Sequence, residues 1–151
     1  MERHISHSIV VDADPSTVFD VLSDPSQHPL FDGSDTVRGR MGGPPRLYLG
    51  SRFAMRMRLG APYVISNTVV EYDEDRRIGW RHMARHIWRY ELTPLGTQGT
   101  QTQVTETFDW GPAPLGFTYA RLGFLSRNDA AIKATLQRLK VLVESRVVTA
   151  R

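Results

Sequence analysis

The segment VVDADPSTVFDVLSDPSQHPLF (residues 10–31) decides the fold, because it joins an apolar strand to two short helices. Residues 4–11 alternate in character and end in an apolar run, which is typical of a strand. Asp14 suits the N-cap of a helix, and Pro15 suits its first turn. The sequence SDP at 23–25 ends this helix and starts a second one. We therefore expect one strand and then two short helices.

The middle of the chain, residues 36–110, consists of short β-forming runs separated by turn-forming residues. In SRFAMRMRL (51–59), large apolar side chains alternate with arginine or alanine, as on a strand with one buried face. Connections as short as these predict an antiparallel meander of six strands.

The C-terminal part, residues 114–146, has the apolar spacing of a helix. Ser126 and Asp129 match a capping box, so a shorter helical piece at 115–124 would precede a break near Gly123. The apolar stripe of the long helix consists of Ile132, Leu136, Leu139 and Val143. One curved antiparallel sheet packed on this terminal helix is the economical α+β arrangement.

Composition narrows the class of protein. A chain of 151 residues suits a single domain over residues 1–151, and the absence of cysteine excludes disulfides and thiolate catalysis. The chain has no apolar run long enough to span a membrane and no secretion signal, so we expect a cytoplasmic protein without stable membrane insertion. The net charge of +3 is too small to indicate nucleic-acid binding. Six arginines crowd one region, which we interpret as a solvated sheet face: Arg38, Arg40, Arg46, Arg52, Arg56 and Arg58.

Residues 10–31, RRIGWRH (76–82), GTQTQVTETFDW (99–110) and LQRLKVLVE (136–144) resemble the START-like (SRPBCC) superfamily, in its polyketide cyclase/dehydrase and lipid-transport branch. The resemblance covers nearly the whole chain. It implies a helix-grip fold, in which the sheet wraps around the last helix with an apolar cavity between them. It implies no single activity, because the superfamily includes carriers, sensors and enzymes. Members commonly have a tryptophan at the position of Phe31, so the resemblance does not specify the shape of the cavity mouth.

Turn lengths predict which residues face one another across the strands. A turn at 73–76 predicts three pairs: Ile78 with Glu71, Trp80 with Val69, and His82 with Asn67. The later turns predict five more: His82 with His86, Trp80 with Trp88, Ile78 with Tyr90, Tyr90 with Glu106, and Trp88 with Phe108. From this register we expect the following ligand-binding residues: Phe31, Phe53, Met55, Met57, Asn67, Trp80, His82, His86, Trp88, Tyr90, Glu106, Phe108 and Trp110.

Glu106 is the unexpected member of this face, since Val104, Phe108 and Trp110 share it. A carboxyl buried among rings resists ionisation, so it could anchor a ligand hydroxyl or amine, or move a proton. Glu106, Tyr90 and His82 are therefore the candidates for catalysis. The alternative interpretation places Glu106 at the cavity rim, paired with an arginine such as Arg81 or Arg121.

His82 and His86 invite a metal interpretation, but the zinc-protease motif needs a glutamate after the first histidine and a helix. The sequence has Met83 at that place. A third ligand could come only from elsewhere in the chain, with Glu71 and Asp109 as candidates, so we expect no metal and instead a polar cluster with Asn67. His28 is expected on a surface helix and is given no role.

The sequence lacks a hydrolase nucleophile elbow, a phosphate-binding loop and a dinucleotide fingerprint, so we expect no cofactor. The first hypothesis is a protein that binds a small hydrophobic molecule, of lipid, aromatic or polyketide-like character, in the cavity. The alternative is a polyketide cyclase, aromatase or dehydratase that works by acid/base chemistry in the same cavity. The third is an interaction module whose arginine-rich face binds an acidic partner. A homodimer is left open, and no nucleic-acid partner is expected.

Overall fold

The computed structural model describes residues 2–82, 85–114, 118 and 123–150. Its seven strands are β1 (His4–Val11), β2 (Val37–Gly42), β3 (Arg52–Leu59), β4 (Ala61–Asp73), β5 (Arg77–Arg81), β6 (Ile87–Leu95) and β7 (Gln101–Asp109). Its helices are α1 (Pro15–Leu22), the 3-10 helix η1 (Pro25–Gln27), α2 (His28–Phe31) and α4 (Phe124–Ala150).

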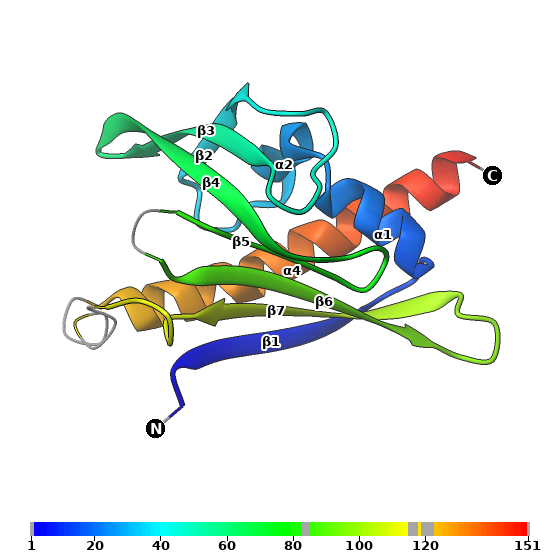
Figure 1. The fold of residues 1–151 in the computed structure, drawn as a ribbon. Coiled ribbons are helices and arrows are strands. Elements are labelled where there is room, and N and C mark those ends of the chain that lie inside the picture. The colour runs from blue at the N-terminus through cyan, green and yellow to red at the C-terminus, as the bar shows by residue number, and fades with distance from the viewer. Residues whose placement is uncertain (1, 83–84, 115–117, 119–122, 151) are drawn as a thin grey trace.

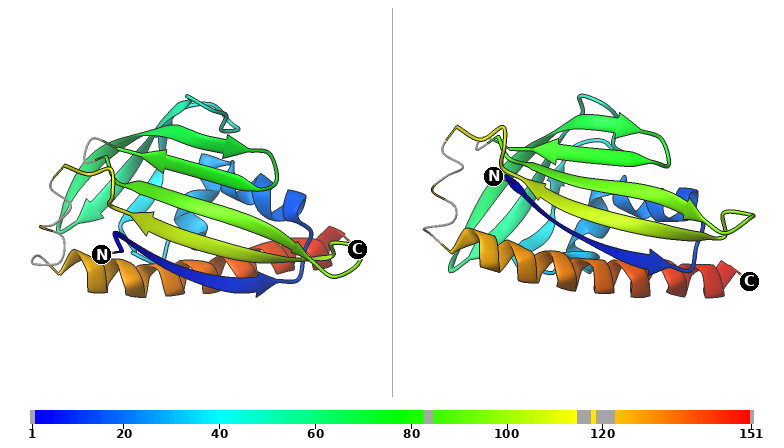
Figure 2. Two further views of the ribbon diagram at one scale, coloured as in Figure 1. Left: turned by 60° about the horizontal axis from the view of Figure 1, so that its bottom comes forward. Right: turned by 90° about the horizontal axis from the view of Figure 1, so that it is seen from below.

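The strands form one antiparallel sheet in the order β1-β7-β6-β5-β4-β3-β2. The sheet curves around α4, which lies along its concave side (Figure 1). Two further views place α1 and α2 on the same side of the sheet as α4 (Figure 2). The α+β helix-grip prediction is confirmed, including the six-stranded meander and the short helices after the first strand. None of the helices in the described part of the chain combines the length and apolar composition of a membrane span.

Two aspartates start the short helices, as their places in the sequence predict. Asp14 Oδ1 accepts a hydrogen bond from the Thr17 backbone N–H at 2.9 Å and caps α1. Asp24 Oδ1 does the same for the Ser26 N–H at 2.9 Å and caps η1. The chain after β1 is thereby turned back onto the concave face of the sheet.

The core lies between the sheet and the buried stripe of α4. The four residues predicted for this stripe are each no more than 2 % exposed: Ile132, Leu136, Leu139 and Val143. α4 begins at Phe124, so Ser126 lies inside its first turn, and the Ser126 hydroxyl donates to the Gly123 carbonyl. The predicted capping box is therefore wrong. Most of the helical piece predicted at 115–124 lies outside the described residues.

The predicted register is correct between β5, β6 and β7. Trp80 faces Trp88, Ile78 faces Tyr90, Tyr90 faces Glu106 and Trp88 faces Phe108. Between β4 and β5, Trp80 faces Val69 as predicted, but Ile78 faces Tyr72, not Glu71. An irregularity between Val69 and Glu71 shifts the register by one residue. Strand β5 ends at Arg81, so His82 lies outside its paired part.

Candidate functional site

A cavity of about 620 Å³ lies between the concave face of the sheet and the N-terminal half of α4. This volume is within the range of roughly 300–1,000 Å³ that small-molecule sites occupy. Four of the eight α4 residues in the cavity wall have short side chains: Ala130, Ala131, Ala134 and Thr135. Because interiors are close-packed, short side chains on one wall leave space open above them.

Ten of the thirteen residues expected at the site line this cavity: Phe31, Phe53, Met55, Met57, Asn67, Trp80, His82, Trp88, Tyr90 and Glu106. His86, Phe108 and Trp110 are not among its lining residues. The Phe108 ring lies 4.7 Å from the Trp88 ring and 4.8 Å from the His86 ring, between centroids. Neighbouring rings therefore cover Phe108, and its position on the inner face does not bring it to the cavity.

The centre of the cavity wall is an aromatic cluster in which His28 takes part. The His28 ring stacks on Trp80 with centroids 4.9 Å apart and an interplanar angle of 20°. It also meets Phe53 edge-on at 5.5 Å, and Trp80 lies 5.7 Å from Tyr90. The prediction that His28 sits on a surface helix is wrong, because α2 turns this side chain inward and buries it.

The protonation state of His28 follows from its contacts. Its Nε2 lies 2.9 Å from the Leu22 carbonyl oxygen, which can only accept, so Nε2 carries the proton. Burial lowers the pKa of His28 from 6.5 to about 4, although the Leu22 carbonyl and the carboxylates of Asp24 and Asp32 favour the charged ring. At neutral pH the cavity wall therefore holds a neutral imidazole.

Glu106 lies in the cavity wall beside Tyr90. The Tyr90 hydroxyl donates to Glu106 Oε1 at 2.9 Å, and both residues are buried. Glu106 Oε2 has no hydrogen-bond partner among the described residues. Burial raises the pKa of Glu106 well above its usual range; the Tyr90 bond opposes this effect, and the charge of Asp32 adds to it. The carboxyl therefore favours its protonated form.

The alternative interpretation of Glu106, as a carboxylate at the cavity rim, is wrong. Glu106 is only 3 % exposed and forms no ion pair within the described ranges. Arg81 pairs across the strands with Thr68, points to the outer face and is exposed. Arg121 lies outside the described residues. The Tyr90–Glu106 pair is thus a neutral polar group inside a mostly apolar wall.

His82 and His86 lie edge-to-face with their ring centroids 4.1 Å apart. Burial lowers the pKa of both rings, that of His86 to about 3. The described part of the chain contains no group of three or more His, Asp or Glu side chains arranged to hold a metal ion. Glu71 and Asp109 both pair with Arg89, through Nε–Oε2 at 2.5 Å and Nη2–Oδ2 at 3.4 Å. This arginine occupies the two carboxylates considered as metal ligands.

The loop at residues 32–36 forms a further wall that the sequence reasoning missed. The Gly33 N–H donates to Thr135 Oγ1 at 2.9 Å, and a Cβ on Gly33 would lie 2.5 Å from the Thr135 backbone nitrogen. Arg138 Nη1 donates to the Asp32 carbonyl at 2.5 Å and to Asp35 Oδ1 at 2.8 Å. These bonds tie the loop to α4. The alanines at 130, 131 and 134 beside Thr135 were the sequence signal for this wall, because short side chains on α4 let the loop come close to the helix.

Comparison with known proteins identifies relatives in sequence and in fold. The uncharacterized protein Rv0088 of Mycobacterium tuberculosis (strain ATCC 25618 / H37Rv) is 39% identical over 141 residues, which cover 89% of this chain and 62% of that protein. This chain thus spans 62% of the length of that curated relative. The Zhui aromatase/cyclase from Streptomyces sp. R1128 superposes with a TM-score of 0.71 at 18% identity, over 96% of this chain and 95% of that one.

The Aha1 dimer from Colwellia psychrerythraea superposes with a TM-score of 0.67 at 16% identity, over 93% of this chain and 96% of that one. At these identities the likeness to solved structures shows the fold alone. The model of one family, described as polyketide cyclase / dehydrase and lipid transport, matches residues 2–144. Because this match covers nearly the whole chain, the protein belongs to the polyketide cyclase / dehydrase and lipid transport family.

Proposed function

We propose that the protein binds a small, largely apolar molecule in the cavity, with one polar group of the ligand beside Glu106. The observation that carries this proposal is Glu106 Oε2, a buried atom without a partner among the described residues. Leaving such an atom unpaired costs about 1–3 kcal/mol. A ligand hydroxyl, amine or carbonyl at this place would remove that cost.

The rest of the wall suits the apolar body of such a ligand. Phe53, Trp80 and Trp88 offer ring faces, and Met55 and Met57 offer flexible side chains that adapt to irregular shapes. A protonated Glu106 can donate a hydrogen bond to a ligand carbonyl. The preferred ligand is therefore an aromatic, polyketide-like or lipid molecule with a single oxygen or nitrogen function on its buried part.

A second function, acid/base catalysis of ring closure in a poly-ketone chain, is supported by the Tyr90–Glu106 hydrogen bond. Glu106 would give its proton to a ketone oxygen while an enol carbon of the same chain forms a bond to the ketone carbon. The resulting carboxylate would accept the proton released from the enol oxygen, and Tyr90 would hold the carboxyl in place during both transfers. His82, which also lines the cavity, is the alternative group for the proton.

The binding proposal is tested by titrating the protein with 1-N-phenylnaphthylamine and following its fluorescence. Ala131→Leu places a larger side chain in the cavity, and we expect it to weaken binding about tenfold or more. Val141→Leu, at a position 69% exposed on α4, is the matched control and leaves binding unchanged. Unchanged affinity in Ala131→Leu, or no binding by the wild type, would contradict the proposal.

Glu106→Gln separates the two functions. Glutamine keeps the shape and the hydrogen-bonding capacity of a protonated carboxyl, so a carrier retains its affinity within about threefold. An enzyme loses turnover of a synthetic poly-β-ketone thioester, because an amide cannot give up and take back the proton. Native mass spectrometry of the purified protein identifies the class of any molecule that copurifies. The homodimer and the cytoplasmic location stay predictions.

A further inference from the structure

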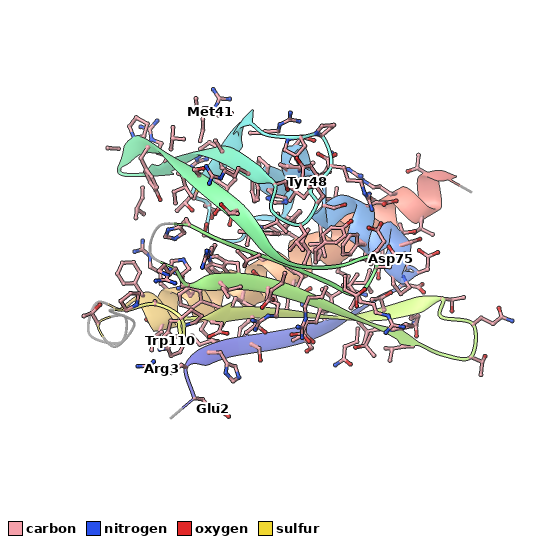
Figure 3. The ribbon with its side chains drawn as sticks, viewed as in Figure 1. Glu2, Arg3, Met41, Tyr48, Asp75 and Trp110 are labelled. Atoms are coloured by element: carbon pink, nitrogen blue, oxygen red, sulfur yellow. The ribbon has the colours of Figure 1, made fainter. Side chains whose placement is uncertain are left out.

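The cavity reaches the surface at one end of the molecule. Seven of its lining residues are exposed, and the two large apolar ones among them are Leu59, by 51% at the end of β3, and Phe124, by 38% at the start of α4. The β3–β4 turn and the start of α4 lie at the same end of the ribbon, on the left of Figure 1. Asp75, in the β4–β5 turn, lies at the opposite end (Figure 3).

The strands β2 and β3, which lead to this end of the molecule, carry a concentration of positive charge. Residues 36–70 contain six arginines and neither Asp nor Glu, so the rest of the chain is net negative. Arg46 pairs with Asp20 and Glu74 near the β4–β5 turn. The other five form no ion pair with any described carboxylate, and all are exposed: Arg38, Arg40, Arg52, Arg56 and Arg58.

The same hairpin exposes apolar side chains. Tyr63, 39% exposed on β4, pairs with Met57 on the same face of the sheet as Leu59, and Val64, 55% exposed, lies on the opposite face. Val64 pairs across the strands with Arg56, so a cation and an aliphatic group stand side by side on the outer face. Apolar groups flanked by arginines match the boundary between lipid headgroups and acyl chains. A nucleic-acid surface would use the arginines and leave the aliphatic groups without a role.

We propose that the β3–β4 hairpin (the docking hairpin, residues 52–64) binds the surface of a membrane that contains anionic lipids, and so brings the open end of the cavity to the bilayer. The arginines contact the headgroups, and Leu59 and Val64 enter the boundary layer. The β4–β5 turn at the other end of the molecule, where Asp73, Glu74 and Asp75 adjoin Arg76 and Arg77, faces away. This binding is peripheral and goes beyond the proposed binding of a ligand in the cavity.

The test is flotation of the intact protein with vesicles. Vesicles of phosphatidylcholine with about 30% phosphatidylglycerol should bind it, whereas pure phosphatidylcholine should bind it weakly. Arg56→Gln with Arg58→Gln is expected to weaken binding about 25-fold, about fivefold for each arginine. Arg76→Gln with Arg77→Gln is the matched control, since it removes the same charge near the β4–β5 turn and should leave binding unchanged.

The apolar contribution is tested separately. Val64→Asn should weaken vesicle binding about fivefold, and Val141→Asn on the exposed side of α4 should have no effect. The cavity variant Ala131→Leu should float like the wild type, so failure of the ligand proposal leaves this test intact. No flotation with anionic vesicles would overturn the proposal. Equal losses of vesicle binding in the two double-arginine variants would also overturn it. So would tight binding of duplex DNA, if Arg56→Gln with Arg58→Gln abolishes that binding while vesicle binding persists.

Discussion

The buried imidazole of His28 makes the stability of the protein depend on pH in a way that can be calculated. Burial lowers the pKa of His28 from 6.5 to about 4. Between these two pH values the unfolded chain binds a proton that the folded chain does not, so the free energy of unfolding falls as the pH falls. The slope is about 1.4 kcal/mol per pH unit, which gives a loss of about 3 kcal/mol between pH 6.5 and 4. Above pH 6.5 the protein has the full contribution of about 3 kcal/mol to its stability that it loses on acidification to pH 4.

His28→Phe isolates the effect, because phenylalanine can still stack on Trp80 and cannot be protonated. The variant leaves the Leu22 carbonyl without its donor, so at pH 7.5 we expect it to be about 1–3 kcal/mol less stable than the wild type. As the pH falls to 4, the wild type should lose about 3 kcal/mol relative to the variant. Urea unfolding at a series of pH values, followed by circular dichroism, measures both free energies.

Val141→Leu, at an exposed position on α4, is the control; it changes no titratable group, so its difference from the wild type should be the same at every pH. His82 and His86 titrate in the wild type and in both variants, so their contributions cancel in the comparison. A second measurement, NMR titration of the His28 ring protons, reports the pKa of this residue directly. A difference between His28→Phe and wild type that stays constant from pH 7.5 to 4 would refute the reasoning from burial.

Three further perturbations test other parts of the structure. Glu106→Gln should gain stability relative to the wild type as the pH rises above about 4.5, because the folded wild type holds its proton to a higher pH than the unfolded chain; urea unfolding at pH 4 and pH 8 measures this. Gly33→Ala should lower the melting temperature by several degrees, since its Cβ would lie 2.5 Å from the Thr135 nitrogen, whereas Gly42→Ala meets nothing within 4 Å and should not. Asp14→Ala removes the cap of α1 and should cost about 1 kcal/mol, measured by thermal unfolding.

The parts of the fold that follow from local chemistry could be predicted from the sequence. Asp14 and the SDP at 23–25 both have the chemistry of a helix start, and each starts a helix where expected. Short turns fix the register of the strands that they join, which is why Trp80–Trp88 is correct. The pair Ile78–Glu71 is wrong because β4 contains an irregularity after Val69. Val69 and Val70 are both apolar, so the hydrophobic pattern gives no sign of the extra residue.

The candidate site was predicted less completely, for two physical reasons. α2 is only four residues long, too short for periodicity to show which way His28 points. The inner face of a strand is also not the same as the wall of a cavity, since Trp88 and His86 cover Phe108. Which inner residues stay uncovered depends on the side chains opposite them. The short side chains of α4 leave the inner residues opposite them uncovered. The apolar stripe predicted for that helix consists of larger side chains and does not include these short ones.

The way in which the cavity is held open bears on how it would bind a ligand. Short side chains on α4 let the opposite wall move inward only as far as its own contacts allow. Here the 32–36 loop is fixed to α4 by the Gly33 N–H and by two bonds from Arg138, so this wall cannot approach further without breaking them. The proposed ligand site is therefore largely preformed, and binding need not order a disordered wall. It follows that a ligand should stabilise the protein by mass action, in proportion to its affinity, with little change in the far-ultraviolet circular dichroism of the folded state. A large change in that spectrum on binding would mean that the loop moves, and that its bonds to α4 do not hold the cavity open.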